Sequence, residues 1–391
     1  ATAVQVRSFC IVHPDSDLDS GGFGFDSAHV DIEVPEGFEA CGGASASSRA
    51  GPLNGRPRLR EFEFGHVFEP KTSQERVFSQ VAEARVLDAV ENLASTAFVA
   101  CGSSGGGKTF AVTGGAKRFA DRGLIPRSAS ALFEALQHRP DRAEYRVSVS
   151  FYEVYKDTLV DLLADRRKIS FQATDRGGVP VGVQRLPASA ECDTYQMLFQ
   201  GDSNRHFERL AYNPETSRGH VFYVLQLEHL TTRREAALAF IDLAAAVDTS
   251  SHAGSTVARS LEAFRAVTAA LHAGLPPRFE DSLLTQLLRP WLQPQDAADP
   301  AGVAVGSQQS PLVHLALISP IRYSDCAREE IFEWLQLMAL LIESLRISEC
   351  PSGRGAAIAN PGSVAPAAAL PLEEILNPDA QTADTDGAPG F

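Results

Sequence analysis

The sequence has three shortages, and each one excludes a class of protein. Basic residues are outnumbered, with 35 Lys and Arg against 49 Asp and Glu and a formal net charge of −14. A general nucleic-acid binder needs a basic face to displace counterions, so we expect no nucleic-acid partner. The six cysteines contain no CxxC pair, and free thiols in a reducing compartment are expected rather than a zinc site or disulfides. No stretch has the pattern of a signal peptide or a bilayer-spanning run, so no membrane partner is expected.

A glycine-rich loop is the most informative stretch that is present. Gly102 to Thr109 is GSSGGGKT, which matches G-x-x-x-x-G-K-[ST]. The apolar, partly β-branched segment 96–100 precedes it and predicts a buried strand, while residues 109–113 can open a helix. Strand, loop and helix in this order are the context in which the motif binds nucleotide phosphates. The alternative, a glycine-rich surface loop with a chance GKT, is disfavoured by this context.

The loop residues suit a nucleotide with Mg²⁺. Glycine lets backbone N–H groups close around phosphate oxygens, and the helix N-terminus adds partial positive charge. Lys108 is expected to reach the β- and γ-phosphates, and the Thr109 hydroxyl to ligate Mg²⁺. We therefore predict ATP or ADP with Mg²⁺ as the cofactor. The predicted cofactor-binding residues of this loop are Gly102, Ser103, Ser104, Gly105, Gly106, Gly107, Lys108, Thr109 and Phe110.

Strands and helices alternate along the chain. Apolar or alternating segments predict strands at residues 1–11, 28–34, 58–68, 145–155, 179–186, 220–229, 236–244 and 311–320. Helical spacing predicts helices at 73–94, 128–137, 193–201, 255–273, 281–292 and 328–345, with residues 123–127 as a turn before a helix capped by Ser128. This alternation indicates an α/β fold with a central, mainly parallel sheet and helices on both faces. Residues 1–348 are predicted to form the domain, and the Pro-, Ala- and Gly-rich residues 349–391 an extended tail.

Several stretches resemble the motor domain of kinesins in order and spacing. FGHVF (64–68) and TSQE (72–75) resemble the segment before the kinesin phosphate loop, and FYEVY (151–155) with DLL (161–163) resembles the family's EIYNE and DLL. GDSNR (201–205) and NPETSRGH (213–220) are similar to its SNR and first switch, NxxSSRSH. IDLA (241–244) falls where the second switch, DLAGSE, belongs, and FEDSLLTQLL (279–288) resembles YRDSKLTxLL. The resemblance covers residues 4–346 and implies a phosphate-loop NTPase fold of kinesin type.

The resemblance also implies roles for individual residues. Lys108 and Thr109 would hold phosphate and Mg²⁺, Ser217 would join the Mg²⁺ shell, and Asp242 would support the ion through water. Residues 114–127 further resemble the ninth kinesin class, whose members work in cilia and flagella. The expected location is therefore the cytoplasm and cytoskeleton, in a ciliary or flagellar axoneme.

The catalytic candidates implied by the resemblance are Asn213, Arg218 and Asp242, if the chain hydrolyses ATP. Asn213 would face the γ-phosphate, and phosphoryl transfer relies on positioned cations and hydrogen bonds of this kind. Two further polar residues are given structural interpretations. His220 is interpreted as a structural neighbour of the nucleotide site, and Glu153, on the polar phase of its strand, is assigned no catalytic role.

The second switch departs from the family pattern, because DLAGSE is replaced by DLAAAV at residues 242–247. Ala245 stands in place of the glycine whose amide senses the γ-phosphate, and its Cβ restricts the backbone. Val247 stands in place of the glutamate that pairs with the first-switch arginine, Arg218. Asp248 could substitute through a slip of one residue. We predict that nucleotide binding survives and that hydrolysis is slow or lost.

Two smaller departures affect the same site. Gly219 replaces a serine of the first switch. IVHP at residues 11–14 stands where the family has RxRP, so Pro14 is retained as a cofactor-binding residue, but the arginine that packs on the adenine is absent.

The surface that would grip acidic tubulin has also lost charge. The loop 248–256 carries no Lys or Arg, and Glu280, Leu283 and Gln286 stand where basic residues are expected. With a net charge of −14, electrostatic steering onto tubulin should be weak. Residues 166–168, RRK, are interpreted either as a solvated turn or as a surviving tubulin contact.

The predicted function is that of a kinesin-like, microtubule-associated protein of a ciliary or axonemal assembly. It would bind nucleotide with impaired hydrolysis and act as a structural or regulatory component, with tubulin and other axonemal proteins as partners. The alternatives are an active ATP-driven motor in which Asp248 or a partner supplies the missing function, and a phosphate-loop NTPase of another class.

Overall fold

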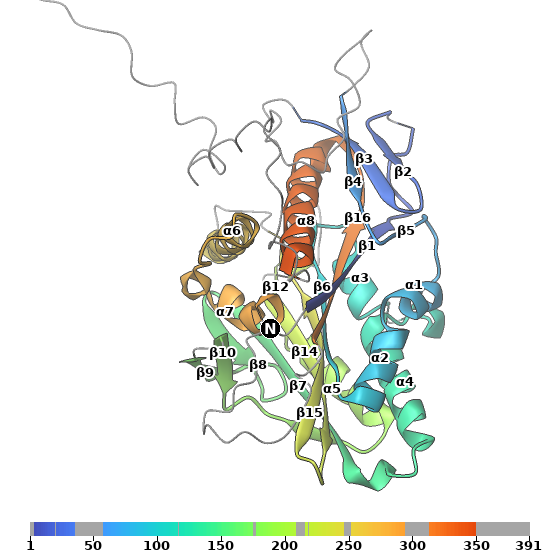
Figure 1. Cartoon of the computed structure of the whole chain (residues 1–391), viewed down its shortest axis with the longest axis vertical. Coiled ribbons are helices and arrows are strands. Elements are labelled where there is room, and N and C mark those ends of the chain that lie inside the picture. The colour runs from blue at the N-terminus through green and yellow to red at the C-terminus, as the bar shows by residue number, and fades with distance from the viewer. Residues whose placement is uncertain are drawn as a thin grey trace, which may run out of the picture.

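A large sheet runs through the chain (Figure 1). The computed structural model describes residues 4–19, 21–35, 58–115, 117–174, 177–208, 216–217, 219–245, 252–293 and 313–348. Within these residues the main path of the sheet has the order β10 (Gly177–Val181), β9 (Arg167–Thr174), β8 (Thr158–Asp161), β7 (Tyr145–Tyr155), β14 (His220–His229), β15 (Arg234–Asp242), β6 (Ser95–Ala100), β16 (Val313–Ile321), β1 (Val4–Val12) and β5 (His66–Phe68). β11 (Leu186–Ala188) also pairs with β7, β2 (Phe23–Phe25), β3 (His29–Glu33) and β4 (Leu59–Glu63) form a smaller sheet, and β12 (Phe207–Glu208) pairs with β13 (Thr216–Ser217).

The direction of pairing changes at β15. From β15 through β6, β16 and β1 to β5 the strands are parallel, whereas from β15 through β14, β7, β8 and β9 to β10 they are antiparallel. The ends of β6, β15 and β16 meet at one edge, because Ala100 pairs with both Asp242 and Ile318. The carboxyl ends of parallel strands are where sheets of this kind bind ligands.

Helices cover both faces of the sheet, which confirms the predicted α/β class. On one face α1 (Gln74–Val81), α2 (Glu83–Asn92), α4 (Leu124–Gln137) and α5 (Glu191–Ser203) share a core with Phe98 and Phe240, whose rings stack with centroids 4.9 Å apart. On the other face α6 (His252–His272), α7 (Leu283–Leu292) and α8 (Arg328–Ser348) pack with Ala97 and Val99. Successive strand residues point to opposite faces, so neighbours on β6 join different cores.

The single strand predicted for residues 58–68 is wrong, because two strands occupy this range. β4 ends at Glu63 in the small sheet, and β5 begins at His66 beside β1. The chain changes sheets at Gly65, whose N–H donates to Ser8 Oγ at 3.0 Å. A Cβ on Gly65 would lie 2.9 Å from the Ser8 carbonyl oxygen, so the close approach requires glycine.

Two helix boundaries also differ from the prediction. Helix α4 begins at Leu124 with Gly123 as its N-cap, so residues 123–127 are not a separate turn and Ser128 is buried inside the helix instead of capping it. Pro126 is compatible with the first turn because the N–H groups there have no partner within the helix. The helix predicted for residues 73–94 is divided at Ala82 into α1 and α2, and the Ser73 hydroxyl caps α1 by accepting from the Arg76 N–H.

Some predictions concern residues outside the described ranges. Asn213, Arg218, the loop that contains Asp248 and the predicted tail from residue 349 all fall there. Among the helices that the structure describes, none combines the length and apolar character needed to cross a lipid bilayer.

Candidate nucleotide site

The glycine loop follows β6 and leads into helix α3 (Lys108–Val112). Gly102, Gly105 and Gly107 have φ angles of 141°, 73° and 105°, which residues with a Cβ rarely adopt. Gly106 packs against the end of β16, where an added Cβ would lie 2.5 Å from the Pro320 carbonyl oxygen. The glycines therefore let the loop turn tightly and lie directly on the neighbouring strand.

Lys108 is buried, and its ammonium group lies over the loop. Nζ donates to the Gly102 and Ser103 carbonyl oxygens, each at 2.8 Å. Burial lowers the pKa of the Lys108 side chain, although Asp242 and Glu330 oppose the shift. A bound anion would stabilise this buried positive charge, so the loop fits a nucleotide phosphate. The Ser103 hydroxyl is also buried and has no hydrogen-bond partner among the described residues, so the loop retains unused polar capacity.

Asp242, at the end of β15, joins the loop to a second buried cation. Its Oδ2 accepts from the Thr109 hydroxyl at 2.7 Å and from Arg205 at 3.0 Å. Arg205 follows α5 and also pairs with Asp202 at 3.2 Å. The hydroxyl and carboxylate oxygens of Thr109 and Asp242 are the ligand type that Mg²⁺ prefers, so this pair fits the predicted ion. The sequence prediction assigned no role to Arg205.

The segment after Asp242 is fixed by His220, at the start of β14. The His220 Nδ1 atom accepts from the Ala244 N–H at 3.2 Å, and the ring's Nε2 donates to the Ser260 hydroxyl at 2.7 Å. Burial lowers the pKa of His220 to about 4, which keeps the ring neutral at pH 7 and consistent with one donating and one accepting nitrogen. Ala245, the next residue along the chain from Ala244, is also buried. His220 therefore positions the backbone that begins the second switch.

Two carboxylates near the site were missed or misjudged from the sequence. Glu153 is completely buried on β7, although alternation placed it on the polar phase of the strand. Its Oε2 accepts from His206 Nδ1 at 2.6 Å, and burial raises the pKa of its carboxyl group. Glu330 on α8 accepts from the Ser104 N–H of the loop at 3.1 Å. Only the fold shows this contact, since the two residues are 226 positions apart and Glu330 belongs to no motif.

The other predicted site residues are placed less completely. Pro14 lies in a turn after β1 and follows His13. The His13 ring lies near the glycine loop, because a Cβ added to Gly107 would be 3.7 Å from His13 Cδ2. Phe110 is 49% exposed on α3. Ser217 ends β13, where the structure describes its backbone pairing with Phe207.

A strand that delivers a glycine loop with GKT to a helix, beside an aspartate at the end of the next strand, defines the phosphate-loop NTPase fold. The family model of the kinesin motor domain matches residues 42–298, which is more than half of the chain. The chain belongs to this family.

Curated relatives are kinesins from distant organisms. The "Kinesin-like protein KLP1" of Chlamydomonas reinhardtii is 30% identical over 58% of this chain and 28% of its own length. The mouse "Kinesin-like protein KIF9" is 27% identical over the same shares of the two chains, 58% and 28%. The "Kinesin heavy chain" of Drosophila melanogaster is 29% identical over 58% of this chain and 25% of its own. The matched region is thus only about a quarter of each relative's length.

Proposed function

We propose that this chain is a nucleotide-holding kinesin domain that associates with microtubules, in a ciliary or axonemal assembly, and whose ATP hydrolysis is impaired. Its role would be structural or regulatory. ATP or ADP would lie on the loop from Gly102 to Phe110, next to Pro14. Lys108 would bind phosphate, and Thr109 and Ser217 would ligate Mg²⁺, with Asp242 acting through water. The intact glycine cradle and the buried Lys108 ammonium support this part of the proposal.

The proposed loss of hydrolysis rests on one observation: the six residues of the second switch retain the aspartate but have lost the glycine and the glutamate of the family. Asp242 is retained and bonded to Thr109, yet Ala245 and Val247 stand where the family has glycine and glutamate. The Asp242 carboxylate can support Mg²⁺, but an alanine and a valine offer no group to activate water or pair with Arg218. Without those groups, phosphoryl transfer loses positioning that it depends on. Asn213, Arg218 and Asp242 would carry any remaining catalysis.

The charge distribution supports a weak grip on microtubules. Arg278, which precedes the short 3₁₀ helix Phe279–Asp281, pairs with Asp281 at 3.0 Å. Arg289 on α7 lies over the Phe279 ring, 5.4 Å from its centroid. Both arginines are engaged within the chain, so they offer less positive charge to an acidic track.

The deciding experiment is ATP turnover by the purified chain with and without microtubules, with Lys108→Ala as the blank. We expect labelled nucleotide to bind the unmutated chain while its turnover equals that of the blank. Microtubule-stimulated turnover well above the blank would instead establish the active motor. Ala245→Gly combined with Val247→Glu restores the family residues, and this variant should raise turnover if their loss is the cause.

The ciliary part rests on the resemblance of residues 114–127 to the ninth kinesin class and needs its own test. A fluorescently tagged chain expressed in a ciliated cell should accumulate along the axoneme. Even labelling of cytoplasmic microtubules with no ciliary enrichment would refute this part and leave the biochemical part untouched.

A further inference from the structure

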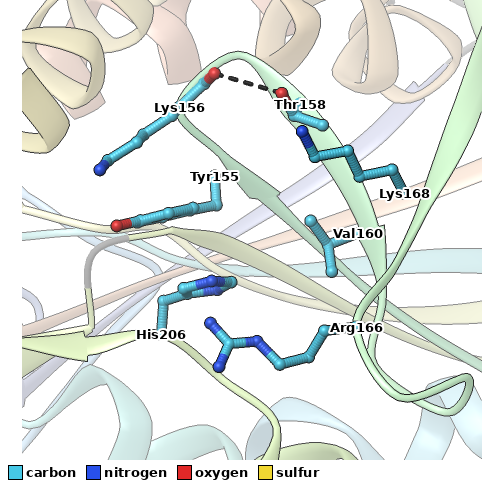
Figure 2. Close-up of a pocket in the computed structure, with 7 residues that line it drawn as sticks. All are labelled: Tyr155, Lys156, Thr158, Val160, Arg166, Lys168 and His206. Carbon is cyan, nitrogen blue, oxygen red and sulfur yellow. Dashed lines mark hydrogen bonds between the residues drawn. The ribbon is translucent and has the colours of Figure 1, made fainter.

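A small basic pocket lies on the antiparallel side of the sheet, away from the glycine loop in the sequence. It has a volume of about 210 Å³ and is formed by the β7–β8 turn, the start of β9 and the residue after the SNR segment. Figure 2 shows its seven lining residues, which are Tyr155, Lys156, Thr158, Val160, Arg166, Lys168 and His206. The proposed nucleotide chemistry uses none of them.

The pocket concentrates positive charge in an acidic protein. Lys156, Arg166 and Lys168 line it together with His206, and no carboxylate does, although the chain carries a net charge of −14. Within the part of the chain that the structure describes, none of these three cations forms an ion pair. The Lys156 ammonium instead lies over the Tyr155 ring, 5.1 Å from its centroid. Three unneutralised cations around one cavity favour an anionic ligand.

The backbone holds two of these cations in a conformation that disfavours their side chains. Lys156 and Arg166 have φ angles of 49° and 61°, in the left-handed region where glycine is the natural choice. Lys156 precedes Asp157 and Arg166 follows Asp165, and both aspartates are also left-handed. Glycine would relieve this strain but would remove the charge. Strained residues of this kind accumulate at binding sites, where the surrounding fold maintains them.

Two stacked rings form part of the remaining wall of the pocket. Figure 2 shows the Tyr155 ring facing the His206 imidazole. The two rings stack with centroids 3.8 Å apart and an interplanar angle of 10°. His206 is fixed by its hydrogen bond to the buried Glu153 carboxylate. Val160 adds an apolar contact, and the Thr158 hydroxyl adds a polar one. The site is therefore preorganised, which reduces the entropy lost on binding.

We propose that this pocket binds a phosphate dianion, presented by a phosphorylated serine or threonine of a partner protein. A phosphate carries about −1.5 to −2 charges and three strong acceptor oxygens, which match several cations better than a single carboxylate does. Arg and Lys are the usual phosphate ligands, and the apolar Val160 can contact the carbon stem of the modified residue. The volume is below the roughly 300 Å³ at which pockets for larger ligands begin, so a second nucleotide is a poorer match.

The test is direct binding to the full chain in the absence of nucleotide and microtubules, so its outcome is independent of the proposed function. The probes are a short neutral peptide with one central phosphoserine, its serine and glutamate counterparts, and inorganic phosphate. We expect the phosphopeptide to bind and the serine peptide not to bind. Arg166→Gly should weaken phosphopeptide binding about tenfold, since one charged contact is commonly worth that factor. Lys108→Ala identifies any phosphopeptide binding at the glycine loop. Arg166→Gly should leave binding at that loop unchanged.

A matched control separates charge loss from backbone effects. Arg233 has a φ of 57° and lies in the β14–β15 turn, at the far end of β7, because His229 pairs with Tyr145. Arg233→Gly removes the same charge from the same conformation and should leave binding unchanged. Both glycine variants should melt no lower than the unmutated chain, because glycine relieves the left-handed strain. Equal binding by inorganic phosphate would uphold the phosphate site with the free ion as its ligand. The proposal would be overturned if Arg166→Gly had no effect on phosphopeptide binding. It would also be overturned if the glutamate peptide bound as tightly as the phosphopeptide, and that result would favour an acidic protein surface as the ligand.

Discussion

The loop after β6 and the segment after β15 lie side by side, because Ala100 pairs with Asp242, yet they are held by different means. The loop depends on glycine backbone: three positive φ angles and the close contact of Gly106 with Pro320. The segment after β15 depends on buried side chains, with Asp242 bonded to Thr109 and Arg205, and Ala244 bonded to His220. Substitution of the second-switch glycine and glutamate has therefore left this segment anchored. Phosphate binding and the chemistry of hydrolysis can be lost separately in this arrangement.

The largest expected effect is on the side-chain anchors. Arg205→Gln should lower the free energy of unfolding by about 3–5 kcal/mol, because it leaves the buried Asp242 carboxylate without its cation. Urea denaturation measures this loss. Arg233→Gln is the matched control, since Arg233 is exposed and its pair with Glu228 at 2.8 Å should contribute less than about 1 kcal/mol. Similar losses in both variants would show that the Asp242 anchor has no special importance.

The glycine loop should respond through ligand affinity. Gly106→Ala forces the loop away from Pro320 and should weaken Mg·ADP binding by about 100-fold, or about 2.7 kcal/mol. Gly105→Ala is the control: its Cβ would meet no atom within 4 Å, so only its φ of 73° is strained. That strain costs about 1–2 kcal/mol of stability and should reduce affinity much less. Titration with a fluorescent ADP distinguishes the two, and equal losses would argue against the cradle.

The His220 anchor should make stability depend on pH. Its folded pKa of about 4 lies below the unfolded value of about 6.5, so the unfolded chain takes up a proton that the folded chain does not as the pH falls between these values. The contribution of neutral His220 to the free energy of unfolding is fully present above about pH 6.5. At pH 5 this free energy should be lower by about 2 kcal/mol. Urea denaturation at pH 7 and pH 5 should show this extra loss in the unmutated chain and not in His220→Gln. Groups common to both proteins, such as Glu153, cancel in the comparison.

The sequence was informative where the physical cause is local. GKT after an apolar strand predicts the loop, and the spacing of DLA predicts that Asp242 lies near it, because both sit at the ends of adjacent strands. The burial of Glu153 could not be predicted in this way. Alternation assumes that one face of a strand meets water, whereas residues 147 and 149–154 of β7 are buried on both faces.

The basic pocket could not be predicted from the sequence, for a different reason. Tyr155 and His206 are 51 positions apart, and they stack only because the fold brings the end of β7 to the residue that follows the SNR segment. Residues 166–168 were interpreted as a solvated turn or a tubulin contact. In the structure Arg166 ends the turn and Arg167 begins β9, so only Arg166 and Lys168 face the pocket. Three segments that carry no common motif meet there, and sequence spacing has no signal for that.

The smallest expected effect tests whether the first switch has been rebuilt around a glycine. A Cβ on Gly219 would lie 2.4 Å from Glu153 Oε1, so the serine that the family has at this position cannot coexist with the present place of the carboxylate. Gly219→Ser should cost about 1–2 kcal/mol of unfolding free energy, as overpacking of a buried site does. In a Glu153→Ala background the same serine should cost little, because its neighbour is gone, and the coupling in a double-mutant cycle should reach about 1 kcal/mol. If the losses of the two single variants simply added in the double variant, glycine would be needed at this position for its backbone alone. The Glu153–His206 pair would then not depend on Gly219.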